Sequence, residues 1–198
     1  MKKILLAAAL LLMSLCFADN SHAGNFGVFG GANFHTSNVK EVGKQTLTQW
    51  HAGIVYKFDL PLGFQIHPTL MYNVKAATTQ AAPLDFSVGY IEFMPSVQWG
   101  ADLILFRPYI EVSPFVGYGL NGWGDLASIW KSADRFEYGV GLGGGLQIWR
   151  FQVAARYNFT FADLSKVDLE TLRNTDFNGV SVSLTYFFGN AKKKNKGK

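Results

Sequence analysis

Apolar and polar residues alternate with a period of two along most of this chain, and no other feature restricts its fold as strongly. In VSVSLTYFF (Val180 to Phe188) the first, third and fifth residues are aliphatic, whereas serine or threonine occupies the positions between them. Such alternation is typical of β-strands with one face in an apolar environment and one face in a polar environment. Eight segments of this kind are expected, at about residues 25–35, 46–59, 63–74, 86–101, 106–121, 135–149, 150–162 and 177–188.

The connections between these segments alternate between short and long. Three are tight turns, at Leu60-Pro61-Leu62, around residues 102–105 and at Trp149-Arg150, and four are long, at residues 36–45, 75–85, 122–134 and 163–176. Short turns at one end and long loops at the other are typical of outer-membrane barrels. We therefore predict an all-β fold, an eight-stranded antiparallel up-and-down transmembrane β-barrel of the outer-membrane type. The alternative is a soluble, lipocalin-like barrel, whose aliphatic stripes would line a cavity for a small molecule.

The first 23 residues are expected to be a secretory signal peptide that precedes the barrel. Lys2 and Lys3 form a charged start, an apolar run follows over residues 4–17, and Ser21-His22-Ala23 places small residues at a cleavage site. Cleavage after Ala18 is an alternative. The predicted organisation is a signal peptide at 1–23, a barrel at 24–189 and a lysine-rich tail at 190–198.

Charge and cysteine content exclude several classes of protein. The only cysteine, Cys16, lies in the predicted signal peptide, so the exported chain would have no disulfide framework and no cysteine nucleophile. Residues 24–191 contain 11 Lys and Arg against 13 Asp and Glu, a net charge of −2. The barrel is therefore not expected to bind nucleic acid, and the net charge of +4 of the whole chain comes from its two ends.

A membrane environment assigns the two faces of each strand. Apolar side chains would face lipid and polar side chains the lumen, the reverse of a soluble barrel, and the even number of strands would leave both termini in the periplasm. Aromatic residues near the strand ends would form the two belts that membrane interfaces favour. The belt at the short-turn end is expected to hold Phe58, Phe64, Trp99, Trp149, Phe151 and Phe188, and the belt at the long-loop end Trp50, Tyr72, Tyr118 and Tyr138.

Two stretches share the pattern Tyr-Ile-Glu-x-x-Pro: YIEFMPSV, which starts at Tyr90, and YIEVSPFV, which starts at Tyr109. The alternation turns Glu92 and Glu111 into the lumen, because a charge that faced hydrocarbon would be costly. The proline of each stretch conflicts with a paired strand, since proline has no backbone N–H. Together with Pro68 in the preceding strand, these prolines suggest a bulged or locally loosened wall.

These motifs resemble the PorT-like outer-membrane β-barrel family of Gram-negative bacteria. The resemblance rests on IHPTLMY (Ile66 to Tyr72), on the pattern that starts at Tyr90, and on PYIEVSPFVGY (Pro108 to Tyr118). It continues through the glycine-rich sixth strand to the aromatic end of the eighth. The resemblance implies an outer-membrane barrel inserted by the barrel-assembly machinery; most members have no assigned activity, and PorT itself is linked to protein secretion. One departure is that ten residues follow Phe188, so a terminal aromatic insertion signal would have to be read internally.

Polar side chains occupy inward positions on several of the predicted strands. Because the interior of an eight-stranded barrel is just filled by side chains, we expect a network of ion pairs and hydrogen bonds that plugs the lumen. A proton relay or a ligand site is the alternative. The residues expected in this network are His51, His67, Glu92, Glu111, Glu137 and Arg156.

The sequence predicts no catalytic residue, no cofactor and no metal site. The pattern G-x-G-x-x-G from Gly139 to Gly144 has the form of a dinucleotide-binding motif, but it lies within a predicted strand and no helix follows it. We expect the alternate glycines from Gly139 to Gly145 instead to leave room in the lumen for long side chains opposite them.

Apolar residues of the predicted loop at 122–134 are candidates for contact with a partner, and packing on the barrel rim is the alternative. These residues are Trp123, Ile129 and Trp130.

The pattern as a whole predicts a non-enzymatic, monomeric protein with a structural or interaction role in the cell envelope. Its expected partners are outer-membrane lipid, the barrel-assembly machinery, and an envelope or secretion protein, with no nucleic acid. A narrow channel for small solutes is the first alternative, and a lipid-modifying outer-membrane enzyme is the second.

Overall fold

The computed structural model describes residues 25–39, 43–78, 85–124, 136–161 and 178–188. Eight strands account for nearly all of them: β1 (Asn25–Val39), β2 (Gly43–Asp59), β3 (Phe64–Thr78), β4 (Asp85–Gly100), β5 (Arg107–Gly124), β6 (Phe136–Ile148), β7 (Phe151–Thr160) and β8 (Gly179–Phe187). The predicted signal peptide, residues 1–23, and the lysine-rich tail, residues 190–198, lie outside the described residues.

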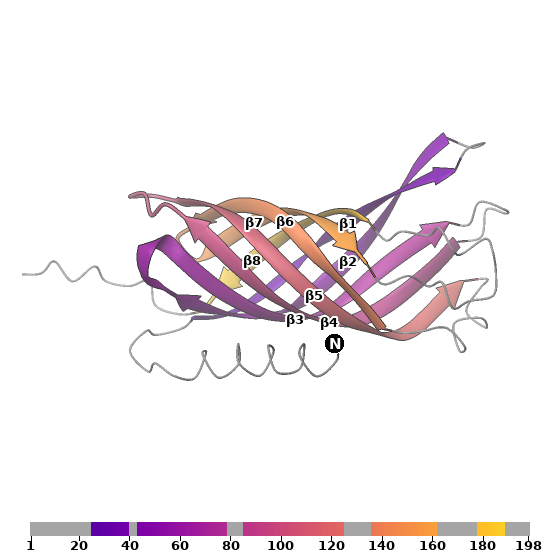
Figure 1. The fold of residues 1–198 in the computed structure, drawn as a ribbon, viewed down its shortest axis with the longest axis horizontal. Helices are drawn as coiled ribbons and strands as arrows, with labels where there is room; N and C mark the ends of the chain where they lie inside the picture. The colour runs from indigo at the N-terminus through magenta and orange to yellow at the C-terminus, as the bar shows by residue number, and fades with distance from the viewer. Residues whose placement is uncertain (1–24, 40–42, 79–84, 125–135, 162–177, 189–198) are drawn as a thin grey trace, which may run out of the picture.

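The strands form one closed barrel, in which every strand is antiparallel to both of its neighbours (Figure 1). The order in space is the order in sequence, and β1 closes the barrel by pairing with β8 from Gly27↔Phe187 to His35↔Gly179. Within the described ranges, no helix has the length and apolarity needed to cross a membrane. The predicted fold class is confirmed, because eight antiparallel strands, each paired with its neighbours in sequence, form a closed barrel.

Several strands extend further toward the long-loop end than the alternation predicted. Most residues in these extensions are small or polar on both faces, so apolar and polar positions no longer contrast along the sequence. Of the segments predicted as loops at residues 36–45 and 75–85, residues 36–39, 43–45, 75–78 and 85 are therefore strand. The extended strands are β1 to Val39, β2 from Gly43, β3 to Thr78 and β5 to Gly124.

Trp123 is not in a loop, contrary to the prediction. It lies in β5 and pairs with Ser87 of β4, so it belongs to the wall of the barrel. The glycines on either side of it, Gly122 and Gly124, have the character of turn residues, which explains why the sequence did not indicate a strand here. The other two contact candidates, Ile129 and Trp130, lie outside the described residues.

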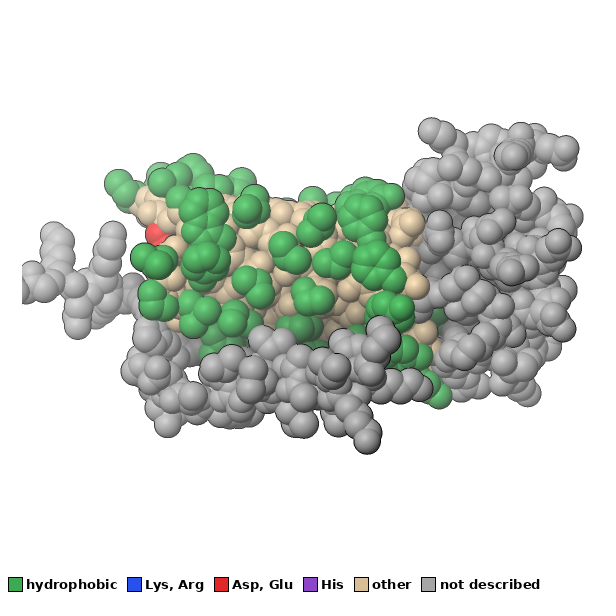
Figure 2. Space-filling view, viewed as in Figure 1, with side chains coloured by type: hydrophobic (Ala, Val, Ile, Leu, Met, Phe, Trp, Pro, Cys, Tyr) green, Lys and Arg blue, Asp and Glu red, His purple; other side chains and the backbone are tan. Residues whose placement is uncertain are grey.

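The two faces of the wall have opposite character. Along β8, side chains alternate between exposed Val180 and Val182 and buried Ser181 and Ser183. Figure 2 shows the resulting outer surface, which is covered by apolar side chains, with an acidic side chain visible only at one end. This arrangement, apolar outside and mainly polar inside, is that of a barrel embedded in lipid.

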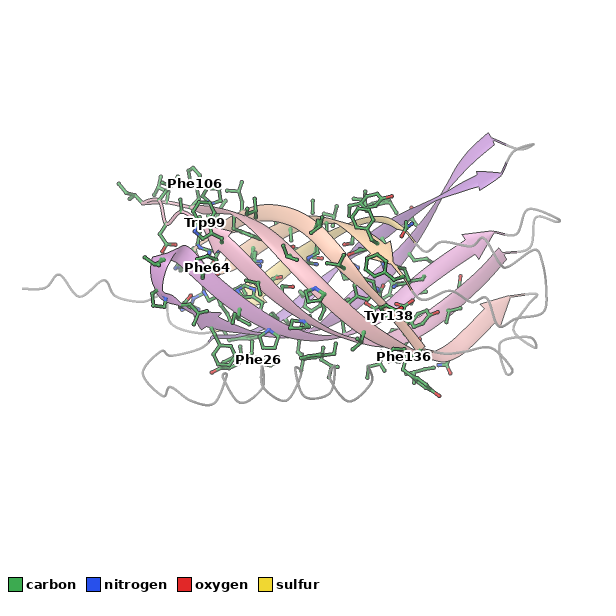
Figure 3. All side chains as sticks on the ribbon, in the orientation of Figure 1. Phe26, Phe64, Trp99, Phe106, Phe136 and Tyr138 are labelled. Atoms are coloured by element: carbon green, nitrogen blue, oxygen red, sulfur yellow. The ribbon has the colours of Figure 1, made fainter. Side chains whose placement is uncertain are left out.

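Aromatic side chains gather at both ends of the apolar surface (Figure 3). Phe64, Trp99 and Phe106 lie at the short-turn end, and Phe136 and Tyr138 lie at the opposite end. All five rings are 41–53% exposed. The belts therefore occupy the positions that the two interfaces of a membrane favour.

The short turns carry large exposed apolar side chains where polar residues are usual. Ile104 is fully exposed, and Leu62, Leu105 and Trp149 are 87%, 79% and 69% exposed. Leu62 and Trp149 also have φ angles of 61° and 56°, a left-handed conformation that bulky residues rarely adopt. The apolar surface of the barrel thus continues past the aromatic belt to the tip of this end.

Candidate functional site

An ionic cluster near the long-loop end of the lumen joins three strands. The ammonium of Lys75 on β3 lies 3.0 Å from Glu92 Oε1 on β4 and also contacts Glu137 Oε1 on β6. All three side chains are at most 4% exposed. We call Lys75, Glu92 and Glu137 the acidic cluster, because a single ammonium faces two carboxylates.

A second ion pair lies deeper in the lumen. Arg156 Nε on β7 donates to Glu111 Oε1 on β5, and the Glu111 side chain is fully buried. Gln98 Nε2 donates to the other carboxylate oxygen of Glu111 at 3.0 Å, and Arg156 Nη1 donates to Ser183 Oγ at 3.4 Å. Here one cation meets one anion, so the charges of the Arg156–Glu111 pair balance.

A chain of hydrogen bonds connects the acidic cluster to this pair. Asn73 Nδ2 donates to Glu92 Oε1 at 2.8 Å, and Asn33 Nδ2 donates to Asn73 Oδ1 at 2.6 Å. His51 Nδ1 lies 2.9 Å from Asn33 Oδ1, while His51 Nε2 lies 2.8 Å from Ser183 Oγ. Since the Asn33 oxygen can only accept, Nδ1 of His51 carries the proton and Nε2 accepts from the serine hydroxyl.

These side chains form one continuous arrangement, which we call the lumen network. Every strand of the barrel contributes at least one member, so the network joins opposite parts of the wall through the interior. Hydrogen bonds in such a poorly solvated setting are strong when all partners are present. The members are Asn33, His51, Asn73, Lys75, Glu92, Gln98, Glu111, Glu137, Arg156 and Ser183.

Most residues predicted for the lumen lie in this network, and one does not. The structure brings together His51, Glu92, Glu111, Glu137 and Arg156. His67 is buried nearer the short-turn end, where its Nε2 lies 3.2 Å from Gln65 Oε1 and its ring centroid lies 5.7 Å from that of Phe187. Gln65 in turn donates to Asp59 Oδ1 at 2.7 Å.

Sequence reasoning missed Lys75, the cation of the acidic cluster. It stands at the first position of a segment predicted as a loop. The signal was nevertheless present, because Asn73 and Lys75 continue the odd-numbered inward series of β3 that starts at Gln65. Following that series past the apolar band would have placed the lysine inside the barrel.

The lumen is less polar than predicted. A group of apolar side chains is buried inside it and fills part of its volume. Polar side chains in the same place would each need a further hydrogen-bond partner. Two cations lie over its aromatic rings: Lys75 Nζ is 4.8 Å from the centroid of Phe115, and Lys57 Nζ is 4.9 Å from that of Phe187. The apolar group consists of Phe29, Val55, Met71, Met94, Phe115 and Phe187.

The glycines of β6 make room for these large side chains, as predicted. A Cβ atom at Gly139 would lie 2.5 Å from the ring of Phe115, and one at Gly145 would lie 2.6 Å from the hydroxyl of Tyr109. Real Cβ atoms essentially never make contacts this short, and at each position a backbone oxygen of β7, that of Phe159 or Val153, would be closer still, at 2.1 and 2.0 Å. The dinucleotide-like pattern is therefore explained by close packing within the barrel.

A small cavity remains beside the lumen network. Three apolar side chains, Met71, Met94 and Phe115, belong to its lining, and the other lining residues are polar and include Asn158 and Ser181. Among the residues that the structure describes, no group of three His, Cys, Asp or Glu side chains is placed to hold a metal ion.

Comparisons with known proteins add to this geometry. Residues 5–188 match the sequence model of the family described as outer membrane protein beta-barrel domain. No curated protein matches the sequence.

Solved structures with a similar fold come from several bacteria. Neisserial surface protein A has 12% sequence identity and a TM-score of 0.49, and the match covers 84% of this chain and 99% of that one. Ail, the attachment invasion locus protein of Yersinia pestis, has 12% identity and a TM-score of 0.46, with coverage of 83% and 97%. Outer membrane protein W of E. coli has 15% identity and a TM-score of 0.44, with coverage of 85% and 100%.

Proposed function

Because the chain belongs to the outer membrane protein β-barrel domain family, matched over residues 5–188, we propose that it is a non-enzymatic protein of the cell envelope whose lumen is closed. Its proposed role is structural, with contacts to other envelope components made from the ends of the barrel. The barrel wall itself is held by lipid on its outside and by the lumen network on its inside.

The lumen network is the observation that supports a closed barrel most directly. It crosses the interior from all eight strands, and a solute could pass only by parting buried ion pairs, which are costly to break. A proton relay through the network is disfavoured, because the side-chain amides of Asn33 and Asn73 stand between the acidic cluster and His51 and do not ionise.

The apolar side chains of the lumen support the same proposal. Phe115 and Met94 lie beside the lumen network, and both are at most 4% exposed. A constriction lined by apolar groups resists wetting, and ions cross such a region poorly. The polar and apolar parts of the lumen therefore both oppose conduction.

Further parts of this proposal concern segments outside the described residues. We propose that residues 1–23 are removed on export, that the barrel-assembly machinery inserts the chain as a monomer with both termini in the periplasm, and that Ile129 and Trp130 belong to a contact surface in the outer loops. The resemblance to PorT-like proteins suggests an envelope or secretion protein as the partner.

Conductance is the test of the closed lumen. The protein, extracted from outer membranes and shown to be folded by heat-dependent gel mobility, is added to a planar bilayer under voltage. We expect no current steps. Reproducible steps of one size would replace the proposal with a narrow channel, whereas loss of a lipid modification on deletion of the gene would indicate an enzyme.

A further inference from the structure

Three prolines form a row across neighbouring strands of the barrel wall. Pro68 of β3 pairs with Pro95 of β4. Pro95 in turn lies opposite Pro114 of β5, because the β4–β5 register runs from Phe93↔Val116 to Val97↔Val112. None of the three is buried, so the row faces the outside of the barrel.

The row interrupts the hydrogen-bond ladder between β4 and β5. In these two described strands no residues pair between Phe93↔Val116 and Val97↔Val112. Antiparallel residues of a hydrogen-bonded pair exchange two N–H···O=C bonds, and proline has no N–H to give. With proline on both sides, both bonds are lost. We call residues 94–96 and 113–115 the β4–β5 seam.

The other sides of these prolines differ from the seam. Beside Pro68 the β2–β3 pairs also stop, between Val55↔Thr69 and Phe58↔Ile66, but Tyr56 opposite Pro68 still has an N–H group, so only one member of that pair lacks a donor. Pro114 pairs with Val140, and the β5–β6 ladder continues without a gap from Arg107↔Gln147 to Tyr118↔Phe136. The N–H position of Pro114 points toward β4, so only the ladder on that side is broken.

The seam lies midway between the aromatic belts. Pro95 is four residues from Trp99 in one direction and four from Ile91 in the other, and Ile91 pairs with the belt residues Tyr72 and Tyr118. At this depth lipid offers no hydrogen-bond donor for the backbone carbonyl groups that the missing N–H groups leave unpaired. The broken ladder is therefore a lasting weak point in the wall.

Behind the seam, the lumen offers both a closing contact and an apolar surface. Ser113 Oγ donates to Ser96 Oγ at 2.8 Å, so a side-chain hydrogen bond crosses the seam where backbone bonds are missing. Both serines are at most 1% exposed. Met94 and Phe115, at the other end of the seam, line the cavity beside the lumen network.

We propose that the β4–β5 seam is a lateral binding site, which admits an acyl chain of a membrane lipid from the bilayer to Met94 and Phe115. The seam opens at the depth of the hydrocarbon, where acyl chains are the only abundant ligand. The linear side chain of methionine adapts to a guest of this shape. The Ser96–Ser113 hydrogen bond closes the seam when no chain is bound. Acyl-chain binding is independent of whether the lumen conducts ions.

Photo-crosslinking from the lipid phase tests the site. The protein is extracted from outer membranes, reconstituted in vesicles of a phospholipid with a diazirine at the middle of one acyl chain, and irradiated, and labelled residues are identified by mass spectrometry. Outward-facing Ile91 should be labelled in any case. The seam predicts additional label on lumen-facing Met94 and Phe115, and none on Ala154, which faces the lumen behind the unbroken β6–β7 ladder.

A reversible disulfide across the seam distinguishes lipid entry through the seam from lipid entry through an open end of the barrel. Ser96→Cys and Ser113→Cys, in a Cys16→Ser background, place two thiols close enough for a disulfide. When this variant is oxidised, the label on Met94 and Phe115 should disappear while that on Ile91 stays, and reduction should restore it. Equal label on Met94 and Phe115 in both states would overturn the proposal.

A second variant repairs the ladder without a covalent bond. Pro95→Val together with Pro114→Val returns two N–H groups to the seam, and restoring two hydrogen bonds should lower the label on Met94 and Phe115 about tenfold. Wild-type label on these residues no higher than on Ala154, or unchanged label in the repaired variant, would show that the seam admits no lipid.

Discussion

Two ionic groups occupy the same lumen and differ in how their charges balance. In the acidic cluster Lys75 serves both Glu92 and Glu137, whereas the Arg156–Glu111 pair has one charge of each sign. The pair also has neutral hydrogen-bond partners on both of its members. In the acidic cluster, removing the cation should therefore lower the unfolding free energy much more than removing one anion. In the Arg156–Glu111 pair, the two losses of unfolding free energy should be closer to equal.

Loss of Lys75 should have the largest effect. Lys75→Met leaves two buried carboxylates facing each other without a cation, and we expect a loss of unfolding free energy at or above about 3–5 kcal/mol, the usual cost of breaking a buried ion pair. Urea unfolding in lipid vesicles measures it. The triple variant Lys75→Met, Glu92→Gln, Glu137→Gln is the matched control, since it removes the stranded charges and should recover most of the loss. A triple variant as unstable as the single one would show that the lysine acts through packing.

Loss of Arg156 should have a smaller effect. Arg156→Met strands only Glu111, which keeps its hydrogen bond from Gln98, so we expect a loss of about 3 kcal/mol. Glu111→Gln should cost less, because the amide oxygen can still accept from the guanidinium. The same unfolding assay and single-channel recording apply to both variants. If both remain as stable and as closed as the wild type, the Arg156–Glu111 pair does not hold the lumen shut.

The glycines next to the two ionic groups allow a comparison of smaller effects on stability. A Cβ atom at Gly143 would lie 2.2 Å from the backbone oxygen of Ala155, whereas one at Gly117 would meet the Cγ atoms of Glu92 and Glu137 at 2.9 and 3.0 Å. Backbone cannot move aside as a side chain can, so Gly143→Ala should cost about 1–3 kcal/mol and Gly117→Ala less.

The control for both glycine variants is Gly30→Ala. A Cβ atom at Gly30 would make only an ordinary contact of 3.7 Å, so the unfolding free energy should stay within about 0.5 kcal/mol of the wild type. A loss at Gly117 as large as that at Gly143 would mean that the two carboxylates of the acidic cluster cannot shift.

Loss of one carboxylate from the acidic cluster should have the smallest effect. Glu137→Gln leaves Lys75 paired with Glu92 and removes one of two acidic groups that crowd each other, so the unfolding free energy should change by less than about 1 kcal/mol and in the stabilising direction. Thermal unfolding by circular dichroism suffices to detect it. A loss as large as that of Arg156→Met would show that both carboxylates are needed and that the charge excess is compensated in the protein.

The strand number, the two faces and the belts could be read from the sequence, because period-two alternation and aromatic positions are local properties. The ends of the strands could not. In the sequence, Lys75 is followed by Ala76, Ala77 and Thr78, which are small residues at both alternating positions, so the alternation loses its contrast and Lys75 appears to start a loop. A single missed strand extension thus removed the central cation from the predicted site.

The seam shows a second limit of sequence reasoning. The prolines are visible in the sequence, but their effect depends on register, which is constant from the turn between β4 and β5 through the seam to Tyr90↔Gly119. A shift of one residue would have placed Pro95 opposite a residue with an N–H group and kept one of the two bonds. Only the paired structure shows that Pro95 and Pro114 face each other.

The apolar short turns bear on the kind of bilayer that suits this barrel. Most membrane barrels end in polar turns that fix their depth, and a thicker bilayer must then deform around them. Here Leu62, Ile104 and Trp149 extend the apolar surface beyond one belt. A thicker hydrocarbon layer can therefore cover these turns, and the bilayer need not become thinner around the barrel. Hydrophobic mismatch should therefore be asymmetric: longer acyl chains are tolerated, while thin bilayers leave the tips of these turns in water.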